Sequence, residues 1–287
     1  MKKIPIRQIS AAQQEPASSG RFNLRKVEDL LGENGLVHGL HRHDFFFILV
    51  LQHGRGRHAI DFTAYQVLDN TVFFLRPGQV HQLELEAGST GFLMEFNTEF
   101  YCPKGGLPAQ RLRRASNRNH CLLEARRFEK LHATVSHIFQ EYTSREEGYV
   151  DAIKAHLAIF FIQLLRQGPD PKGPPTNANP YAQERLEEFL ALLDTHIATH
   201  KQVVQYTDLM NLSPYQLNEI TKDTVGRTPS ALINAHIVLE AKRQLLATAH
   251  QIKEIADLLG YEDASYFIRF FKKHTGHSPE AFRHKLG

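Results

Sequence analysis

The chain has few cysteines, no long hydrophobic run and no signal peptide. Its 287 residues include only Cys102 and Cys121, too few for a disulfide framework and in keeping with a reducing cytoplasm. The longest apolar stretches, residues 45–51 and 158–162, are too short to span a membrane. We therefore expect a cytoplasmic protein without a membrane partner.

The short motifs of common catalytic sites are also missing from the sequence. There is no Gly-x-Ser-x-Gly, no glycine-rich phosphate loop and no pair of carboxylates at the end of a predicted strand. This absence argues against an enzyme. The composition, 42% hydrophobic and 23% charged, is that of a globular protein with an ordinary core and one or two domains.

Positive charge is sparse and local. The net charge is +3, and residues 181–287 hold 12 Lys and Arg against 13 Asp and Glu, a net of −1. Within residues 181–287 the basic residues gather near the C-terminus, where Glu280 is the single acid of residues 268–287: Arg269, Lys272, Lys273, Arg283 and Lys285. Such a patch can meet phosphates over a screening length of about 8 Å. The low total charge of this part of the chain favours modest affinity for DNA per subunit, and hence dimerisation.

A proline-rich stretch divides the chain. Residues 168–180 contain five prolines in 13 positions, which neither a helix nor a central strand tolerates. We read this stretch as a linker. The domains expected around it are a barrel over residues 1–120, a helical pair over 121–167 and an all-helical domain over 181–287.

The N-terminal half carries strand signals followed by helix signals. Short apolar runs between Gly and Pro turns predict an antiparallel barrel or jelly roll over about residues 21–100. We expect residues 58–62 to return along 45–52, and residues 81–85 to return along 71–75. Apolar residues at helical spacing then predict two helices within 122–166. Their stripes either form a dimerisation element or simply pack on the barrel.

The last third repeats one motif twice, about 50 residues apart. Each copy has an apolar anchor, a lysine five residues later and a Gly-x-[Ser/Thr]-Pro turn, after a short helical stretch at 206–210 or 252–259. In the first copy these residues are Leu217, Lys222 and Gly226, and in the second copy they are Phe267, Lys272 and Gly276. Two short helices joined by a tight turn are typical of a helix-turn-helix. A long helix over 230–247 would join the two units.

Over residues 185–285 these features resemble the signature of the AraC/XylS family of bacterial transcription regulators. The second copy carries Ser-Tyr-Phe, Arg-x-Phe-Lys-Lys and Gly-x-Ser-Pro at the family's spacing. The resemblance implies a seven-helix DNA-binding domain with two recognition helices. In the first copy, Glu219 and Thr221 stand where many members have Arg and Phe, which leaves open how strongly that helix reads bases.

The residues expected to face DNA lie on the two recognition helices. On the first helix, over 213–223, Asn218 suits adenine and Glu219 can accept from cytosine. On the second, Arg269 suits guanine, while Lys272 and Lys273 suit phosphates. The full set of expected DNA contacts is Pro214, Tyr215, Asn218, Glu219, Ala264, Ser265, Ile268, Arg269, Lys272 and Lys273.

The N-terminal half resembles the cupin-like sensor domain that precedes this DNA-binding domain in many family members. The resemblance rests on His41-Arg42-His43-Asp44 and Pro77-Gly78-Gln79-Val80-His81. Three histidines invite a metal hypothesis. Metal-binding cupins also supply a carboxylate at the position of Phe47, so we expect no metal and no cofactor here. The expected pocket for a small molecule is His41, His43, Phe45, Phe47 and His81. Strand alternation puts the first four on one face without deciding whether that face is inward.

The sequence thus predicts a transcription regulator with double-stranded promoter DNA as its partner. The barrel would sense a small-molecule effector, the helical pair would make a homodimer, and RNA polymerase is a further candidate partner. Two alternatives stay open at this point. One is a metal-dependent cupin enzyme with an accessory DNA-binding domain, and the other is a regulator whose barrel binds nothing and serves only for dimerisation.

Overall fold

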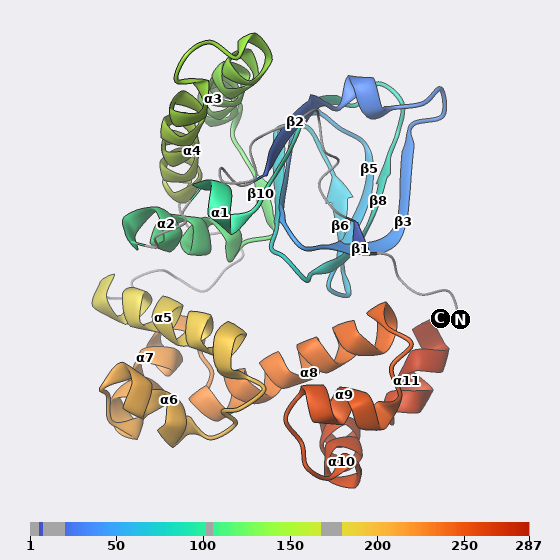
Figure 1. The fold of residues 1–287 in the computed structure, drawn as a ribbon, viewed down its shortest axis with the longest axis vertical. Helices are drawn as coiled ribbons and strands as arrows, with labels where there is room; N and C mark the ends of the chain where they lie inside the picture. Colours follow the sequence, from blue (N-terminus) through green and yellow to red (C-terminus); the bar gives the residue numbers. More distant parts are fainter. Residues whose placement is uncertain (1–5, 8–20, 102–105, 168–179, 287) are drawn as a thin grey trace. The chain divides into compact units, whose positions relative to one another are not determined.

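The chain folds as two compact units that meet in sequence between residues 168 and 169 (Figure 1). The computed structural model describes residues 6–7, 21–101, 106–167 and 180–286. The predicted linker at 168–180 lies outside the described residues, except for Pro180, which begins a helix. Among the described helices, none combines the length and the apolar character needed to cross a bilayer.

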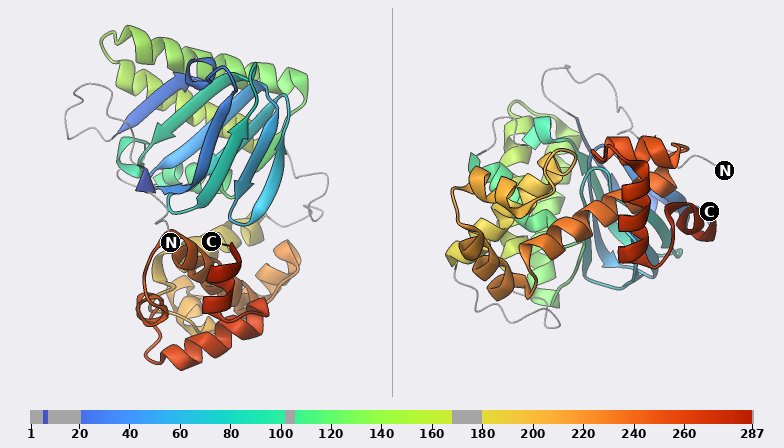
Figure 2. Two further views of the ribbon diagram at one scale, coloured as in Figure 1. Left: turned by 90° about the vertical axis from the view of Figure 1, so that its right-hand side faces the viewer. Right: turned by 90° about the horizontal axis from the view of Figure 1, so that it is seen from below.

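The N-terminal unit is built from two five-stranded sheets (Figure 2). In spatial order, the first sheet contains β1 (Ile6–Arg7), β3 (Leu36–His43), β8 (Val80–Leu85), β5 (Gly56–Ile60) and β6 (Thr63–Val67). The second contains β10 (His120–Leu122), β7 (Thr71–Leu75), β4 (Phe46–His53), β9 (Thr90–Phe96) and β2 (Phe22–Lys26). All pairings are antiparallel except the short one between β1 and β3.

Most strand runs are placed as predicted, but the run at 58–62 is β5 at Gly56–Ile60 followed by a turn, and two predicted returns are wrong. β4 pairs with β7 and β9, whereas β5 pairs with β6 and β8 in the other sheet. The turn at residues 53–56 therefore carries the chain from one sheet to the other, and so does the turn after β7. The reason lies in β4, whose residues 46–51 are buried on both faces. A central strand takes its neighbours from distant segments of the chain, which a local turn signal does not reveal.

Alternate side chains of β4 enter two different cores. Phe45, just before the strand, and Phe47, Leu49 and Leu51 lie in the core between the sheets, with Phe73 opposite them. The other face of β4 joins a core shared with the helices: Phe46, Ile48 and Val50.

His41 and His43 lie on β3 of the first sheet, whereas Phe45 and Phe47 lie just before and at the start of β4 in the second sheet. All four side chains are buried between the sheets, so the inward direction that the sequence left open is settled. The prediction that they share one face of a single strand is wrong, because the chain changes sheets between β3 and β4.

Helices cover the outer face of the second sheet (Figures 1 and 2). They are α1 (Thr98–Tyr101), α2 (Gly106–Ser116), α3 (Ala125–Ser144) and α4 (Tyr149–Leu165), while the 3-10 turn η1 (Glu28–Leu30) follows β2. The two helices predicted over 122–166 are α3 and α4. Their buried apolar residues, such as Leu131, Leu157 and Phe161, pack on the sheet and on each other. The interpretation that these stripes pack on the barrel is confirmed.

The C-terminal unit is helical in all its described elements. These are α5 (Pro180–His196), α6 (Val203–Met210), α7 (Pro214–Val225), α8 (Pro229–Ala247), α9 (Ile252–Leu258), α10 (Ala264–Thr275) and α11 (Pro279–Leu286). One hydrophobic core joins them, with Phe189, Tyr206, Leu217, Ile255 and Phe267 fully buried. The predicted class, a β domain with a helix pair followed by an all-α domain with two helix-turn-helix units, is confirmed.

Local signals fix the ends of α7 and α10, the second helix of each helix-turn-helix pair. Ser213 caps α7, its hydroxyl accepting a hydrogen bond from the Gln216 amide at 3.2 Å, and Pro214 occupies the first turn. Asp263 caps α10 by accepting from the Ser265 amide at 2.7 Å. Gly226 and Gly276 end these helices with φ of +67° and +80°, values that favour glycine. Both helices begin at the predicted caps, and α10 ends at Gly276 as predicted, whereas α7 continues two residues beyond the predicted end at residue 223.

Candidate DNA interface and histidine cluster

The first recognition helix, α7, buries one face and exposes another. Leu217, Ile220 and Thr221 pack into the core. Three of the four predicted contact residues are exposed, and Tyr215 is 72% accessible. Asn218 is half-buried. Because Thr221 is fully buried, its difference from the family pattern changes the packing of α7 rather than its outer surface.

The second recognition helix, α10, has the same division. Phe267 and Phe271 are fully buried. The exposed residues are Ser265, Ile268, Arg269, Lys272 and Lys273, while Ala264 is half-buried and packs against the core. Tyr266, which the sequence analysis missed, is 58% exposed. The sequence did contain a signal for Tyr266. It occupies the same position in the second repeat as Gln216 in the first, directly before the buried anchor, and both side chains end in a polar group.

Arg269 is held only loosely on this surface. Its Nη2 lies 4.0 Å from Oδ2 of Asp263, and the two side chains are 71% and 61% exposed. Ion pairs this open contribute little to stability, so the guanidinium is available to another partner. Asp263 itself is committed to the helix, because the backbone amide of Ser265 lowers the pKa of its carboxyl.

The helix α8 joins the two helix-turn-helix pairs. In Figure 1 it runs from the α6–α7 pair to the α9–α10 pair. Its 19 residues span roughly 28 Å at the α-helical rise. Both pairs also pack against α8 and belong to one hydrophobic core, so their mutual orientation is fixed within this unit.

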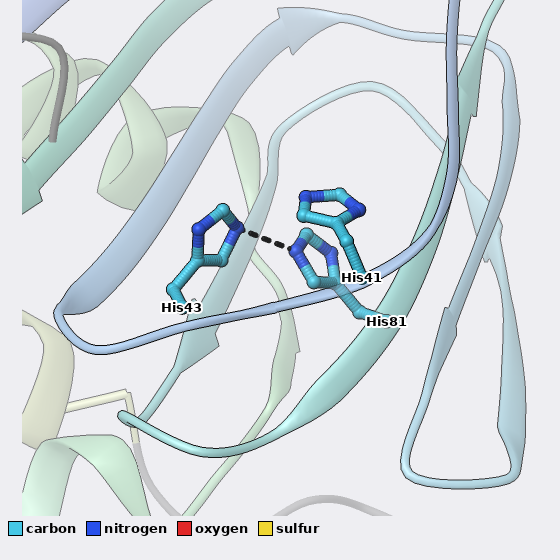
Figure 3. A group of neighbouring side chains, drawn as sticks. All are labelled: His41, His43 and His81. Carbon is cyan, nitrogen blue, oxygen red and sulfur yellow. Dashed lines mark hydrogen bonds between the residues drawn. The ribbon is translucent and has the colours of Figure 1, made fainter. Parts of the chain in front are cut away.

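The five residues predicted to form a ligand pocket lie together in the interior of the sandwich. His41 and His81 have ring centroids 4.2 Å apart, and His43 lies 4.3 Å from Phe45 and 5.4 Å from Phe47. His43 Nε2 is 2.7 Å from His81 Nε2 (Figure 3). All three histidines are buried, with at most 5% of their surface accessible.

A fourth imidazole, missed by the sequence analysis, completes the group. His58 on β5 is fully buried, and its Nε2 lies 2.9 Å from His81 Nδ1. Sheet register brings it there, since His58 sits next to the β8 residue Leu83. The only sequence signal was its position two residues before the buried Ile60 on a predicted strand. We call His41, His43, His58 and His81 the histidine cluster.

Burial keeps the central histidines neutral at physiological pH. It lowers the pKa of His58 to about 3, with smaller contributions from His41 and His120. Burial is also the main cause that holds the pKa of His81 well below its ordinary value, and neighbouring imidazoles add to it. Neutral imidazoles carry one N–H and one lone pair each, so the histidine cluster offers both hydrogen-bond donors and electron-pair donors.

Polar groups next to the histidine cluster hold the turn that precedes His81. The Gln79 side chain donates to Asp61 at 2.6 Å, and its carbonyl oxygen accepts from Asn119 at 2.9 Å. The amide of Gly78 donates to the carbonyl of His43 at 2.8 Å. The Gly78 bond ties the segment before β8 to the end of β3, and the Gln79 bonds tie it to Asp61 and Asn119, so His43 and His81 are positioned by backbone as well as by side chains.

Family models match each unit separately, and curated relatives match across both. A model described as a helix-turn-helix domain matches residues 206–285, and one described as an AraC-like ligand binding domain matches residues 31–102. The HTH-type transcriptional activator RhaS of Enterobacter sp. (strain 638) is 25% identical over 251 residues, covering 85% of this chain and 86% of the relative. RhaS of Yersinia pestis (strain Pestoides F) is 23% identical, covering 86% and 89%.

The comparison with solved structures also finds similar chains. Apo ToxT K231A from Vibrio cholerae is 16% identical with a TM-score of 0.39, covering 96% of this chain and 100% of that one. The C-terminal domain of AraT, a response regulator from Geobacillus stearothermophilus, is 25% identical with a TM-score of 0.34, covering 38% and 88%.

Two helix-turn-helix pairs on one rigid helical unit, which follows a sandwich of the sensor type in the sequence, define a DNA-binding transcriptional regulator and not an enzyme. The two matched segments fall on the two structural units in the order that such regulators have. The chain belongs to the AraC family, with an N-terminal sensor domain and a C-terminal helix-turn-helix domain.

Proposed function

We propose that α7 and α10 enter successive major grooves of promoter DNA, and that Arg269 reads a guanine. The observation that carries this proposal is the pair of exposed, polar helix faces on one rigid unit. Arg269, Lys272 and Lys273 form the basic part of the α10 face, and Asn218 and Glu219 give α7 groups that can pair with base edges. Because promoter DNA is the partner, the protein acts in the cytoplasm.

The separation of the two helices supports this arrangement. Successive major grooves on one side of B-DNA are about 34 Å apart. The connecting helix α8 spans roughly 28 Å, which is comparable with this repeat. The helix α7 precedes the start of α8 in the chain, and α9, which packs against α10, follows its end. A single chain can therefore cover two grooves without any change in the fold of this unit.

Substitution of Arg269 tests the proposal. We expect Arg269→Ala to weaken binding to the specific site by roughly 1–3 kcal/mol and to relax the preference at one base pair. Gel-shift titration against the specific duplex and its single-base variants measures both effects. The exposed Arg126→Ala, on α3, is the matched control and should leave affinity unchanged. An equal loss on every sequence would refute the base-reading role.

We further infer that the interior of the sensor domain holds the effector. The match to a ligand-binding domain and the mutual contact of His41, His43, Phe45, Phe47 and His81 support this assignment. An effector acts only by binding one arrangement of the protein better than another. Adding the effector should therefore change the apparent affinity for DNA, and a chain that binds DNA equally well under all effector conditions would contradict the inference.

We also propose that the protein is a homodimer, with α4 at the interface between the two chains. Most apolar residues of α3 and α4 are used inside the subunit, but Ile159 on α4 is 45% exposed. The net charge of −1 in residues 181–287 predicts weak binding of DNA by a single chain. In a dimer, binding of the first copy raises the effective concentration of the second copy near the DNA, which strengthens binding overall.

A further inference from the structure

The histidine cluster places four buried imidazoles in the interior of the β-sandwich. His41 and His43 come from β3, His81 from β8 and His58 from β5, three strands that are neighbours in the first sheet. His81 lies at the centre, with one ring nitrogen 2.7 Å from His43 and the other 2.9 Å from His58. The available nitrogens of His41, His43 and His81 all lie within 4.8 Å of one another.

A purely structural role explains this group poorly. Four buried imidazoles lose their hydration, and burial of polar groups is costly unless hydrogen bonds replace the lost water. The Nδ1 of His58 is buried and has no hydrogen-bond partner among the described residues. Apolar side chains at these positions would fill the same space without that cost, as Phe47 and Phe73 do beside them.

We propose that His41, His43 and His81, supported by His58, bind a divalent transition-metal ion such as Zn²⁺, and that this ion is the effector of the sensor domain. The second half of the proposal rests on the proposed function, whereas the first half does not. Imidazole is a good ligand for zinc, copper and nickel, and three histidines leave one coordination position for water or hydroxide.

The geometry needs only side-chain movement to accept the ion. Two nitrogens on one tetrahedral zinc ion are about 3.3 Å apart, because each Zn–N bond is about 2.0–2.1 Å. The contact between His43 and His81 must therefore open from 2.7 Å, and the widest separation in the group, at most 4.8 Å, must close.

The packing around the cluster favours an ion over a larger molecule. Phe45, Phe47 and Phe73 are each at most 1% accessible and fill the space between the sheets next to the histidines. A sugar or other metabolite would have to displace these rings. His58, from the neighbouring strand β5, lies 2.9 Å from His81 Nδ1 and would hold the ring of that ligand in place.

The metal site can be tested on the untagged, full-length chain after treatment with a chelator and dialysis. We expect titration calorimetry with ZnCl₂ and elemental analysis to give about one ion per chain. His43→Gln and His81→Gln should each weaken binding about tenfold or more. Circular dichroism checks that both variants stay folded, and a folded variant is required for the comparison.

A surface pair of histidines provides the matched control. His137 and His156 lie on α3 and α4 with ring centroids 5.4 Å apart. His156→Gln should leave the stoichiometry and affinity unchanged. Loss of zinc binding in this control, retention of full binding in His43→Gln and His81→Gln, or absence of binding to the wild type would each overturn the metal site.

DNA binding separates the two halves of the proposal. If zinc is the effector, its addition should change the affinity for the promoter about fivefold or more, as is typical of allosteric coupling. Zinc binding without any change in DNA affinity would overturn the effector role and keep the metal site. Failure to bind DNA with or without zinc would instead count against the proposed function.

Discussion

Arg269 and Lys272 lie within one turn of α10, yet their chemistry predicts different roles. The planar guanidinium can bond a guanine edge in two places, whereas a lysine ammonium is a compact charge suited to phosphate. Both side chains are exposed. The first is therefore expected to contribute to sequence preference and the second to affinity for any duplex.

Lys272→Ala should reduce the salt dependence of DNA binding. Removing one phosphate contact lowers the slope of log K against log salt by about one, because one fewer counterion is released. Gel-shift titrations at several salt concentrations give the slope. The exposed Lys130→Ala, on α3, should keep the wild-type value. An unchanged slope in the Lys272 variant would remove this residue from the phosphate contacts.

The buried histidines should make the sensor domain sensitive to acid. The folded pKa of His58 is about 3, below the ordinary value of 6.5, so the unfolded chain takes up a proton first as the pH falls. Stability is then full above about pH 6.5 and decreases towards pH 3, by at most about 1.4 kcal/mol per pH unit for each such histidine.

Urea denaturation of chelator-treated protein at about pH 7 and about pH 5.5 measures this effect. His58→Phe should show a smaller loss between the two conditions, because one titrating group is gone. His156→Gln, on the surface, should behave as the wild type does. A free energy of unfolding that stays level or increases on acidification would contradict the assignment of neutral, buried imidazoles.

At the scale of elements, Gly260 fixes how the second helix-turn-helix pair packs. Its φ is +70°, and a Cβ added there would lie 1.6 Å from the carbonyl oxygen of Ala198. Lys201 donates to both carbonyl groups, of Ala198 and of Gly260 itself, so the two segments are held together at this point. A side chain at position 260 would have to push them apart.

Gly260→Ala should cost roughly 3 kcal/mol or more of folding free energy, since it combines a left-handed backbone with a backbone clash. Gly226→Ala provides the control. It has a similar φ of +67° but nothing within 4 Å of the added Cβ, so only the conformational cost of about 1 kcal/mol remains. Chemical denaturation of both variants measures the difference, and equal losses would show that the clash is relieved by a small movement.

The sequence predicted these helical elements better than the sheet pairing, for a physical reason. The ends of α7 and α10 depend on residues within one turn, Ser213 and Asp263 at the start and Gly226 and Gly276 at the end. The pairing of β4 and β5 depends on strands up to 50 residues away, so the turn at 53–56 was misread as a hairpin. His58 was missed for the same reason, because its contact with His81 is set by sheet register.

The predicted pocket residues were found where alternation within one strand sufficed. His41 and His43 alternate on β3, Phe45 and Phe47 alternate around the start of β4, and the Pro-Gly turn before His81 marked the strand that brings the third histidine. That these strands belong to opposite sheets could not be predicted from alternation. Which face of β4 points inward could not be predicted either, because β4 is apolar on both sides. Similarly, the helical pair over 122–166 was placed correctly, while its packing on the sheet required knowing which strands form the outer face.

At the scale of the whole molecule, self-association is the property most open to test. If α4 lies at the interface between two copies, Ile159→Glu should convert a dimer into a monomer, since it puts a charge into a contact between apolar surfaces. Light scattering after size-exclusion chromatography gives the mass. Val37→Glu, at an exposed site on β3, should leave the dimer intact. A wild-type protein that is monomeric at all concentrations would refute the proposed interface.

Strand β4 has a consequence for how any event inside the sandwich is felt elsewhere. Phe47 touches the rings of His43 and His81, while its neighbour Phe46 packs against Phe74 and Phe96, which in turn contact Phe161 of α4. Phe46 and Phe47 are consecutive residues on opposite faces of β4, so a shift of this strand moves both. A rearrangement around the imidazoles is thereby transmitted to the helix layer through the backbone of β4.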